Sequence, residues 1–381
     1  MLLISAGAFA DSGDLLALNI GVIRKYDENI SKVPANGSVG PVENDGSTAT
    51  QLNLSLNKQY SMQRLTLKIG LSDNRYDSLK ELNSLGENNS AAWQWQLTPH
   101  LTGDLTASHS KSQSDFADFR GSGQNISTVD SRHFGANWQL TGGWSLGAGI
   151  ANTKSINSQP FQENPGSEQR IVDANLTYKF ASGSSIALLI SNSRGEQSGA
   201  ADPVTLSDNR FRERRYDLRL NWPFSGVTTL SGGLGQVRRT HDHFSVRDYT
   251  EYNGNAIVSW APTGKTQFTL TRSRTAENWQ ESNSSFSIRD LTGLVASWSI
   301  TPKVSMRAKA DWTARSFGGD IPGQPSNDRI DKTLSSSLGI DWAVYTKIKL
   351  GALISEDRRR STVDTNDYRS RTATLSANIE F

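Results

Sequence analysis

The sequence contains no cysteine among its 381 residues, which excludes a disulfide framework and any thiolate metal site. No run of about eighteen apolar residues occurs either, and a transmembrane helix needs a run of that length. Charge of one sign is not in excess, because 40 Lys and Arg residues face 38 Asp and Glu residues and leave a net charge of +2. A nucleic-acid partner is therefore not expected, since it would require a strongly basic face.

Hydrophobic residues are also scarce. They make up 35% of the chain, and the mean hydropathy is -0.52. A soluble protein of this length would have little material for a core. A barrel with a wet interior needs less, because only the lipid-facing half of each strand has to be apolar.

The sequence does contain a repeated unit. From Leu16 onward, stretches of about ten residues alternate apolar with polar side chains, and a period of two is typical of a strand with one apolar and one polar face. The clearest copies lie at 51–56, 65–72, 172–180, 215–222, 304–312 and 373–381.

The connections between these units are alternately short and long. Short connections carry turn residues, as at 140–143, 181–183, 223–226, 261–264 and 301–303. Long connections are polar and fall at roughly 27–47, 74–89, 111–130, 155–168, 195–211, 239–250, 274–288, 315–332 and 356–368. This arrangement predicts an all-β fold, a transmembrane antiparallel outer-membrane β-barrel of about eighteen strands. The short turns would be periplasmic and the long loops extracellular.

The two ends of the sequence agree with an outer-membrane location. Residues 1–10 finish on Ala8-Phe9-Ala10 and are predicted to be the remainder of a secretory signal peptide, with residues 11–381 forming a single barrel domain. Phe381 closes the last alternating strand and resembles the signal read by the bacterial barrel-assembly machinery. We therefore expect the outer membrane of a Gram-negative bacterium, with the lipid bilayer and lipopolysaccharide as surroundings.

Aromatic residues near the predicted strand ends suit a girdle at the lipid interface. Aromatic residues favour strands in any protein, however, so this signal alone does not separate a membrane barrel from a soluble β-sandwich. Together with the alternating loop lengths, it favours the barrel.

The polar residues between the apolar positions predict the lining of the lumen. The charged ones proposed to form the path of the solute are Lys68, Lys179, Arg215, Asp217, Arg219, Arg307, Lys309, Asp311, Asp341 and Lys349. Asp104, Asp173 and Glu380 add negative charge, so the two signs nearly cancel. A pore for a strongly charged solute would carry an excess of the opposite sign, and a neutral or weakly charged hydrated solute is therefore favoured.

Two charged series stand out on this predicted lining. Residues 215, 217 and 219 read Arg, Asp and Arg, and residues 307, 309 and 311 read Arg, Lys and Asp. They form either a track for the solute or pairs that stabilise the wall, and pairing is the preferred interpretation. Alternation does not reveal whether a loop folds inward.

Catalysis is not expected. Only His241 and His243, on either side of Asp242, are clustered, and such a group could hold a metal or serve a surface protease. No third ligand or second carboxylate pair has a recognisable spacing. The preferred interpretation is that these residues lie in solvent at the base of a loop. We predict no catalytic residue, no metal and no cofactor.

A short motif gives a family resemblance. Tyr26-Asp27-Glu28-Asn29, followed by Ile30, resembles the opening signature of the EpsL-type, exosortase-associated outer-membrane proteins of exopolysaccharide biosynthesis, a group within a wider family of β-barrel porins. The sequence departs from that signature at Glu28, where Asp is usual. The resemblance implies a conduit that carries a polysaccharide across the outer membrane, with separate periplasmic export proteins as partners.

Three hypotheses of function follow. The leading one is passive export of an exopolysaccharide by a monomeric barrel. The alternative is a general or sugar-selective diffusion porin, and the third is a structural or adhesive barrel that acts through its extracellular loops. Conductance separates the first two hypotheses from the third.

Overall fold

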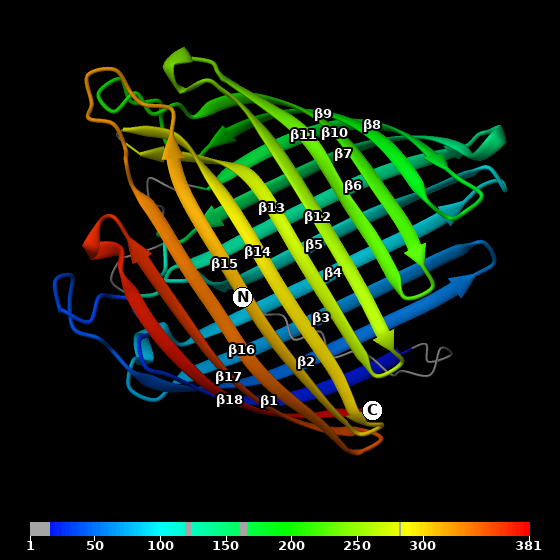
Figure 1. Cartoon of the computed structure of the whole chain (residues 1–381), viewed down its shortest axis with the longest axis horizontal. Coiled ribbons are helices and arrows are strands. Elements are labelled where there is room, and N and C mark those ends of the chain that lie inside the picture. The colour runs from blue at the N-terminus through cyan, green and yellow to red at the C-terminus, as the bar shows by residue number, and fades with distance from the viewer. Residues whose placement is uncertain (1–15, 119–122, 160–165, 282) are drawn as a thin grey trace.

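The computed structural model describes residues 16–118, 123–159, 166–281 and 283–381, which form one barrel of eighteen antiparallel strands (Figure 1). Each strand pairs with its neighbours in sequence, and β1 also pairs with β18. The predicted fold class and strand number are confirmed. The signal peptide predicted for residues 1–10 lies outside the described residues.

The strands are long enough to cross a bilayer when tilted. They are β1 (Leu16–Asp27), β2 (Asp45–Tyr60), β3 (Gln63–Tyr76), β4 (Ser84–Gln96), β5 (Leu101–Gln113), β6 (Ile126–Gln139), β7 (Trp144–Asn157), β8 (Ser167–Lys179), β9 (Ser185–Gln197), β10 (Arg210–Ser225), β11 (Thr228–His241), β12 (Tyr249–Thr263), β13 (Thr266–Glu281), β14 (Ser284–Thr301), β15 (Val304–Gly318), β16 (Ile330–Tyr345), β17 (Ile348–Ser361) and β18 (Tyr368–Glu380). The described residues also form short 3-10 helices η1 (Lys80–Leu82), η2 (Thr141–Gly143), η3 (Ser245–Arg247) and η4 (Asp364–Asn366).

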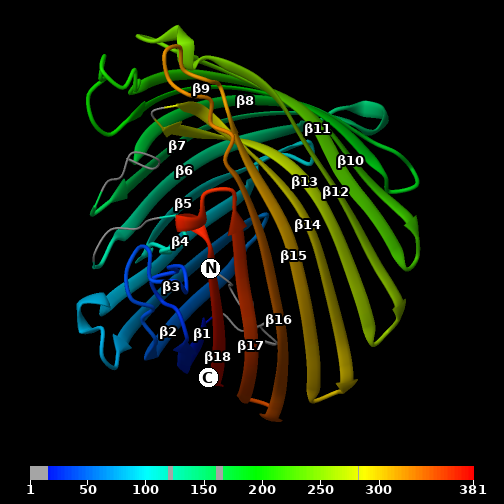
Figure 2. The same cartoon turned by 60° about the vertical axis from the view of Figure 1, so that its left-hand side comes forward.

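The ring closes between the first and last strands, which lie side by side in Figure 2. Asn19 lies opposite Glu380, and the backbone N–H of Phe381 donates to the carbonyl of Leu18 at 2.8 Å. A closed ring leaves no strand edge with unpaired backbone groups, which hydrocarbon would not tolerate.

Long connections gather at one end of the barrel and short turns at the other, as Figure 1 shows. One predicted long connection, at 274–288, is wrong. β13 continues to Glu281 and β14 begins at Ser284, so a tight turn replaces the loop. The Asn- and Ser-rich composition of this segment is typical of a loop, but its residues pair across strands and are buried inside the barrel mouth.

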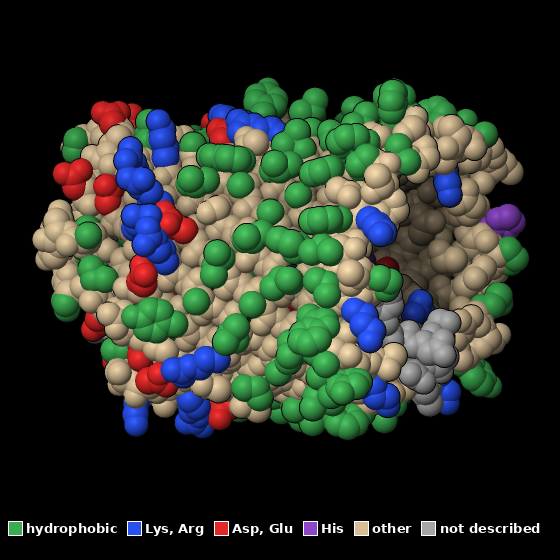
Figure 3. All heavy atoms as spheres, turned by 60° about the horizontal axis from the view of Figure 1, so that its bottom comes forward, with side chains coloured by type: hydrophobic (Ala, Val, Ile, Leu, Met, Phe, Trp, Pro, Cys, Tyr) green, Lys and Arg blue, Asp and Glu red, His purple; other side chains and the backbone are tan. Residues whose placement is uncertain are grey.

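The outer surface carries a belt of exposed apolar side chains, which are gathered over the middle of the face shown in Figure 3. Leu218, Leu220 and Trp222 on β10 are exposed and alternate with inward polar residues. Such a surface would be unfavourable in water and suits the hydrocarbon of a bilayer. No helix among the described residues is long and apolar enough to span a membrane.

Candidate functional site: a narrowed lumen

The strand register places all ten predicted lumen residues on the faces opposite the apolar belt. Their charges are only partly paired. Lys309 contacts Asp311 on its own strand at 2.6 Å, and Lys349 lies 4.0 Å from Glu380 on β18. The Lys309–Asp311 pair therefore runs along a strand and not across two strands.

The loop between β5 and β6 folds into the lumen. Its Asp118 carboxylate lies 3.2 Å from Arg315 on β15 and 3.4 Å from Arg359 on β17. The carbonyl of Ala117 accepts a further hydrogen bond from Arg359. These partners belong to the far side of the ring, so the described part of the loop up to Asp118 reaches across the barrel mouth.

The β13–β14 hairpin narrows the lumen from another side. The ladder between β12 and β13 stops at the pair Gly254 and Arg274, although both strands continue. Beyond that point Ala276 and Ile288 are buried against Val237 and Tyr249, which lie on the inner faces of β11 and β12. The end of the hairpin thus leaves the wall and packs inside the barrel.

Arg247 of η3 holds this hairpin in place. Its guanidinium is fully buried and donates to the carbonyls of Glu281 and Ser284 in the hairpin. It also donates to the carbonyls of Thr205 and Leu206 in the β9–β10 loop. Four satisfied carbonyls around one buried cation tie three extracellular segments together.

A cavity of about 410 Å³, which we call the eyelet, lies between the hairpin and the β8–β11 wall. Its lining residues are Asp118, Gly166, Ser167, Gln169, Gln197, Phe211, Arg215, Arg239, Glu277, Asn278, Trp279 and Arg315.

The two sides of the eyelet have different charge arrangements. On β10 and β11, the single carboxylate of Glu213 pairs with Arg215 at 2.5 Å and with Arg239 at 2.9 Å, so one positive charge is in excess. On the opposite side, Glu277 pairs with Arg289 at 2.6 Å and lies 3.7 Å from Arg315.

Aromatic rings accompany the charges of the eyelet. The Arg239 guanidinium stacks 3.9 Å from the ring centre of Phe211, and that of Arg315 lies 4.8 Å from the ring of Trp279. These contacts hold the arginines in fixed positions, and both rings are buried.

Sequence reasoning missed most of the eyelet. Arg239, Glu277 and Arg315 fell in predicted loops, although the alternation of their strands continues through them. That continued alternation was the available signal. Asp118 gave no signal, because nothing local marks a loop that turns inward.

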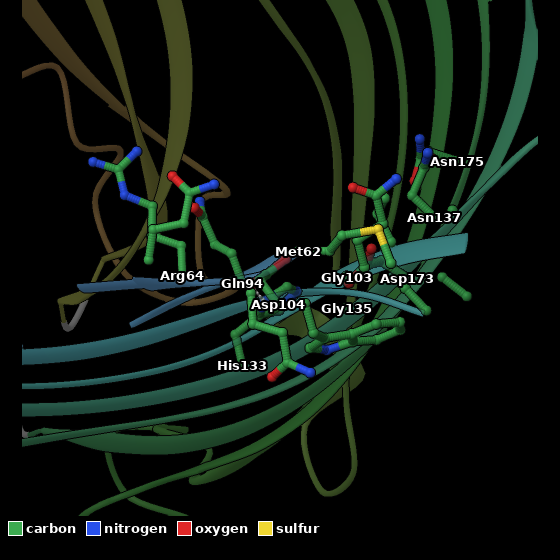
Figure 4. A pocket seen from close by; sticks show the side chains of 18 residues that line it. Met62, Arg64, Gln94, Gly103, Asp104, His133, Gly135, Asn137, Asp173 and Asn175 are labelled. Atoms are coloured by element: carbon green, nitrogen blue, oxygen red, sulfur yellow. Dashed lines mark hydrogen bonds and ion pairs between the residues drawn. The ribbon is translucent and has the colours of Figure 1, made fainter. Parts of the chain in front are cut away.

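A second cavity lies nearer the short turns and measures about 550 Å³. Figure 4 shows Arg64 and Gln94 on one side of it and Asn137 and Asn175 on the other. Amide groups of this kind donate and accept hydrogen bonds without adding charge. The cavity is therefore a polar, nearly neutral vestibule.

The histidine cluster does not assemble into one site. β11 ends at His241, whose Nδ1 lies 3.3 Å from Asp248, whereas Nδ1 of His243 lies 2.9 Å from Asp208. The described residues contain no group of three or more His, Asp or Glu side chains placed to hold a metal.

The motif that carries the family resemblance is structural. Asp27 is buried and contacts Lys32 at 3.5 Å, and Ser370 donates to it at 2.6 Å. Asn29 is buried and donates to the carbonyl of Arg369 at 3.0 Å. Tyr26 and Glu28, by contrast, are exposed. The motif therefore fastens the first long loop to β18 at the barrel seam.

Comparisons with known proteins agree with this architecture. Residues 224–381 match a family model described as "Putative beta-barrel porin 2". No curated protein matches the sequence. The structure resembles three outer-membrane proteins of Pseudomonas aeruginosa. They are OpdK, OccK2 and OccK9, with sequence identities of 11%, 12% and 10% and TM-scores of 0.53, 0.54 and 0.55. Each comparison covers 96% of this chain, together with 99% of OpdK, 98% of OccK2 and 98% of OccK9.

The chain has the fold of an outer-membrane porin. At these identities the solved structures show the fold alone. The matched family model and the apolar belt are separate observations that agree with an outer-membrane barrel. This porin-like barrel lies in the outer membrane of a Gram-negative bacterium, as the sequence predicted.

Proposed function

We propose that this barrel is a selective diffusion porin for small hydrated solutes that carry one carboxylate. The observation that carries the proposal is the eyelet. A lumen eighteen strands wide would pass solutes with little discrimination. The inward loop and hairpin replace that wide opening with a passage whose β10–β11 side has two arginines on one carboxylate.

The chemistry of the eyelet supports a solute with a carboxylate. Arg215 has a half-exposed side chain and can share its guanidinium with a passing anion. The buried rings of Phe211 and Trp279, from β10 and β13, hold Arg239 and Arg315 in place beside it. Two of the similar solved structures, OpdK with vanillate and OccK2 with glucuronate, are described with solutes of this kind.

The test is ion selectivity and solute uptake of the purified barrel in lipid bilayers and liposomes. We expect Arg215→Gln to lower the permeability for chloride relative to potassium by roughly two- to five-fold, the effect of a water-exposed charge. Uptake of glucuronate should fall while uptake of glucose does not change. Unchanged selectivity would contradict the proposal, and the absence of any conductance would favour the structural or adhesive barrel.

Export of a polysaccharide is the second candidate. The observation that favours it is the polar vestibule, whose amides suit the hydroxyl groups of a sugar chain. Deleting the gene in its host separates the candidates. Polymer trapped in the periplasm would support export, and unchanged surface polymer with reduced solute uptake would support the diffusion porin. A monomeric state, periplasmic export partners and an assembly role for Phe381 stay predictions.

A further inference from the structure

The outward faces of β8–β11 change character along the strands. Near the middle, one register row reads Leu176, Leu188, Leu218 and Leu234, and all four side chains face the bilayer. Two outward rows further toward the long loops, β10 and β11 carry Arg214 and Arg238, and the next row carries arginine on β8, β9 and β10. These exposed residues are Arg170, Arg194, Arg210, Arg212, Arg214 and Arg238, which we call the arginine patch.

The arginines of the patch lie directly opposite one another. Arg170 pairs in register with Arg194, and Arg194 with Arg212 on the next strand. Arg214 lies opposite Arg238. Neighbouring strands are about 4.8 Å apart, and like charges in directly opposite positions destabilise a sheet.

Acidic side chains compensate this charge only in part. Arg210 pairs with Glu196 at 3.6 Å and Arg212 with Asp242 at 3.5 Å. The remaining members of the patch form no ion pair with any acidic residue that the structure describes. These are Arg170, Arg194, Arg214 and Arg238.

The outward arginines of β13 show the contrasting arrangement. Arg272 and Arg274 share the carboxylate of Asp290 on β14 at 3.2 and 2.9 Å. The face shown in Figure 3 likewise has acidic and basic side chains side by side beyond the apolar belt. The patch on β8–β11 therefore has a cation excess that an external anion would neutralise.

We propose that the arginine patch binds the phosphate groups of lipopolysaccharide. Three features favour this occupant. The patch is continuous with the apolar belt, so an amphiphile could place acyl chains on the leucine row and its phosphates on the arginines. It lies on the side of the long loops, where the outer leaflet contains lipopolysaccharide. Guanidinium groups also bind phosphate through paired hydrogen bonds. This inference does not depend on the solute that the lumen carries.

The experiment measures lipid A binding to the full-length barrel in detergent. The patch variant is Arg194→Gln with Arg214→Gln, and the matched control is Arg272→Gln with Arg274→Gln on β13. We expect the patch variant to bind bis-phosphorylated lipid A at least about ten-fold more weakly, and the control to bind as the wild type does. Without lipid A, the patch variant should unfold at the same temperature as the wild type or higher, because repulsion has been removed.

Several outcomes would overturn the proposal. These are equal affinity of wild type and patch variant, an equal loss in the control, and tight binding of lipid A that lacks phosphates. Stabilisation by inorganic phosphate alone, equal to that by lipid A, would show a simple anion site. If the glutamine variant does not fold, Arg194→Lys with Arg214→Lys keeps the charge and should lose part of the affinity, since lysine lacks the two-pronged geometry.

Discussion

The two halves of the lumen wall differ in chemistry. The inward side chains of β2–β9 are mostly hydroxyls, amides and glycines, whereas those of β10–β17 include most of the charged residues. On the charged half these are Glu213, Arg215, Asp217, Arg219, Arg239, Glu251, Glu277, Arg289, Arg307, Lys309, Asp311, Arg315, Asp331, Asp341, Lys349, Asp357 and Arg359. The neutral half exchanges hydrogen bonds with any hydrated solute, and the charged half can discriminate by sign.

The position of a charge matters more than the total. Positive and negative residues nearly cancel over the whole lumen, as the sequence suggested. At about 0.1 M salt a charge is screened beyond about 10 Å, so a residue on one wall of the wide lumen has little influence on a solute near the other. In the eyelet the β5–β6 loop residue Asp118 and the β13–β14 hairpin lie close to the β8–β11 wall, so a solute there is within reach of charges from both sides.

The largest expected effect comes from releasing the hairpin. Arg247→Ala would leave the carbonyls of Thr205, Leu206, Glu281 and Ser284 without their buried donor and should destabilise this end of the barrel locally by about 2–4 kcal/mol. The hairpin then moves away from the lumen and the eyelet widens. We expect a higher single-channel conductance and faster proteolysis of the β9–β10 loop.

Arg247→Lys is the matched control for this change. Lysine keeps the charge but lacks the planar group that reaches four carbonyls on two segments, so an intermediate conductance is expected. A conductance equal to that of the wild type in both variants would mean that the hairpin does not limit the passage.

The sequence predicted the wall of this barrel better than its interior. All eighteen strands follow from a period of two, because every residue of a strand in a membrane barrel faces either lipid or lumen. The prediction of a long loop at 274–288 was wrong because Ala276 and Ile288 pack on inward residues of β11 and β12. This tertiary contact outweighs a loop-like composition. Asp118 lies 197 positions from Arg315, and no local pattern connects residues so far apart.

The next largest effect is a change in ion selectivity, which should be greater for a charge altered in the eyelet than for one altered on the neutral wall. Glu277→Gln removes the carboxylate from Arg289 and leaves Arg315 with Asp118 alone, so the preference for anions should rise by roughly two- to five-fold. The control Asn53→Asp adds a charge to the inner face of β2, where the lumen is wide, and should change selectivity much less. Reversal potentials in a salt gradient measure both. Equal and opposite changes would mean that total charge, and not position, sets selectivity.

The smallest expected effect is a dependence on acid. Asp208 lies in the β9–β10 loop, where burial alone would raise its pKa, but N–H groups of Arg210, His243 and Phe244 and the ring of His243 hold the pKa below its ordinary value. A lowered pKa in the folded state stabilises the loop above the pKa of the unfolded chain. That stability is lost as the pH falls through the folded value.

We therefore expect the β9–β10 loop to open only below about pH 4, with the loss of about 1 kcal/mol of local stability. The side-chain amide of Gln280 in the hairpin donates to the carbonyl of Asp208, and the backbone N–H of Asp208 donates to the side-chain oxygen of Gln280. Opening of the loop should therefore also disturb the hairpin that lines the eyelet. We expect this disturbance to appear as current noise in acid. Asp208→Asn cannot titrate and should make that noise independent of pH. Noise that rises equally in the variant would assign the acid response to another carboxylate, because neutral asparagine has no charge to lose over this pH range.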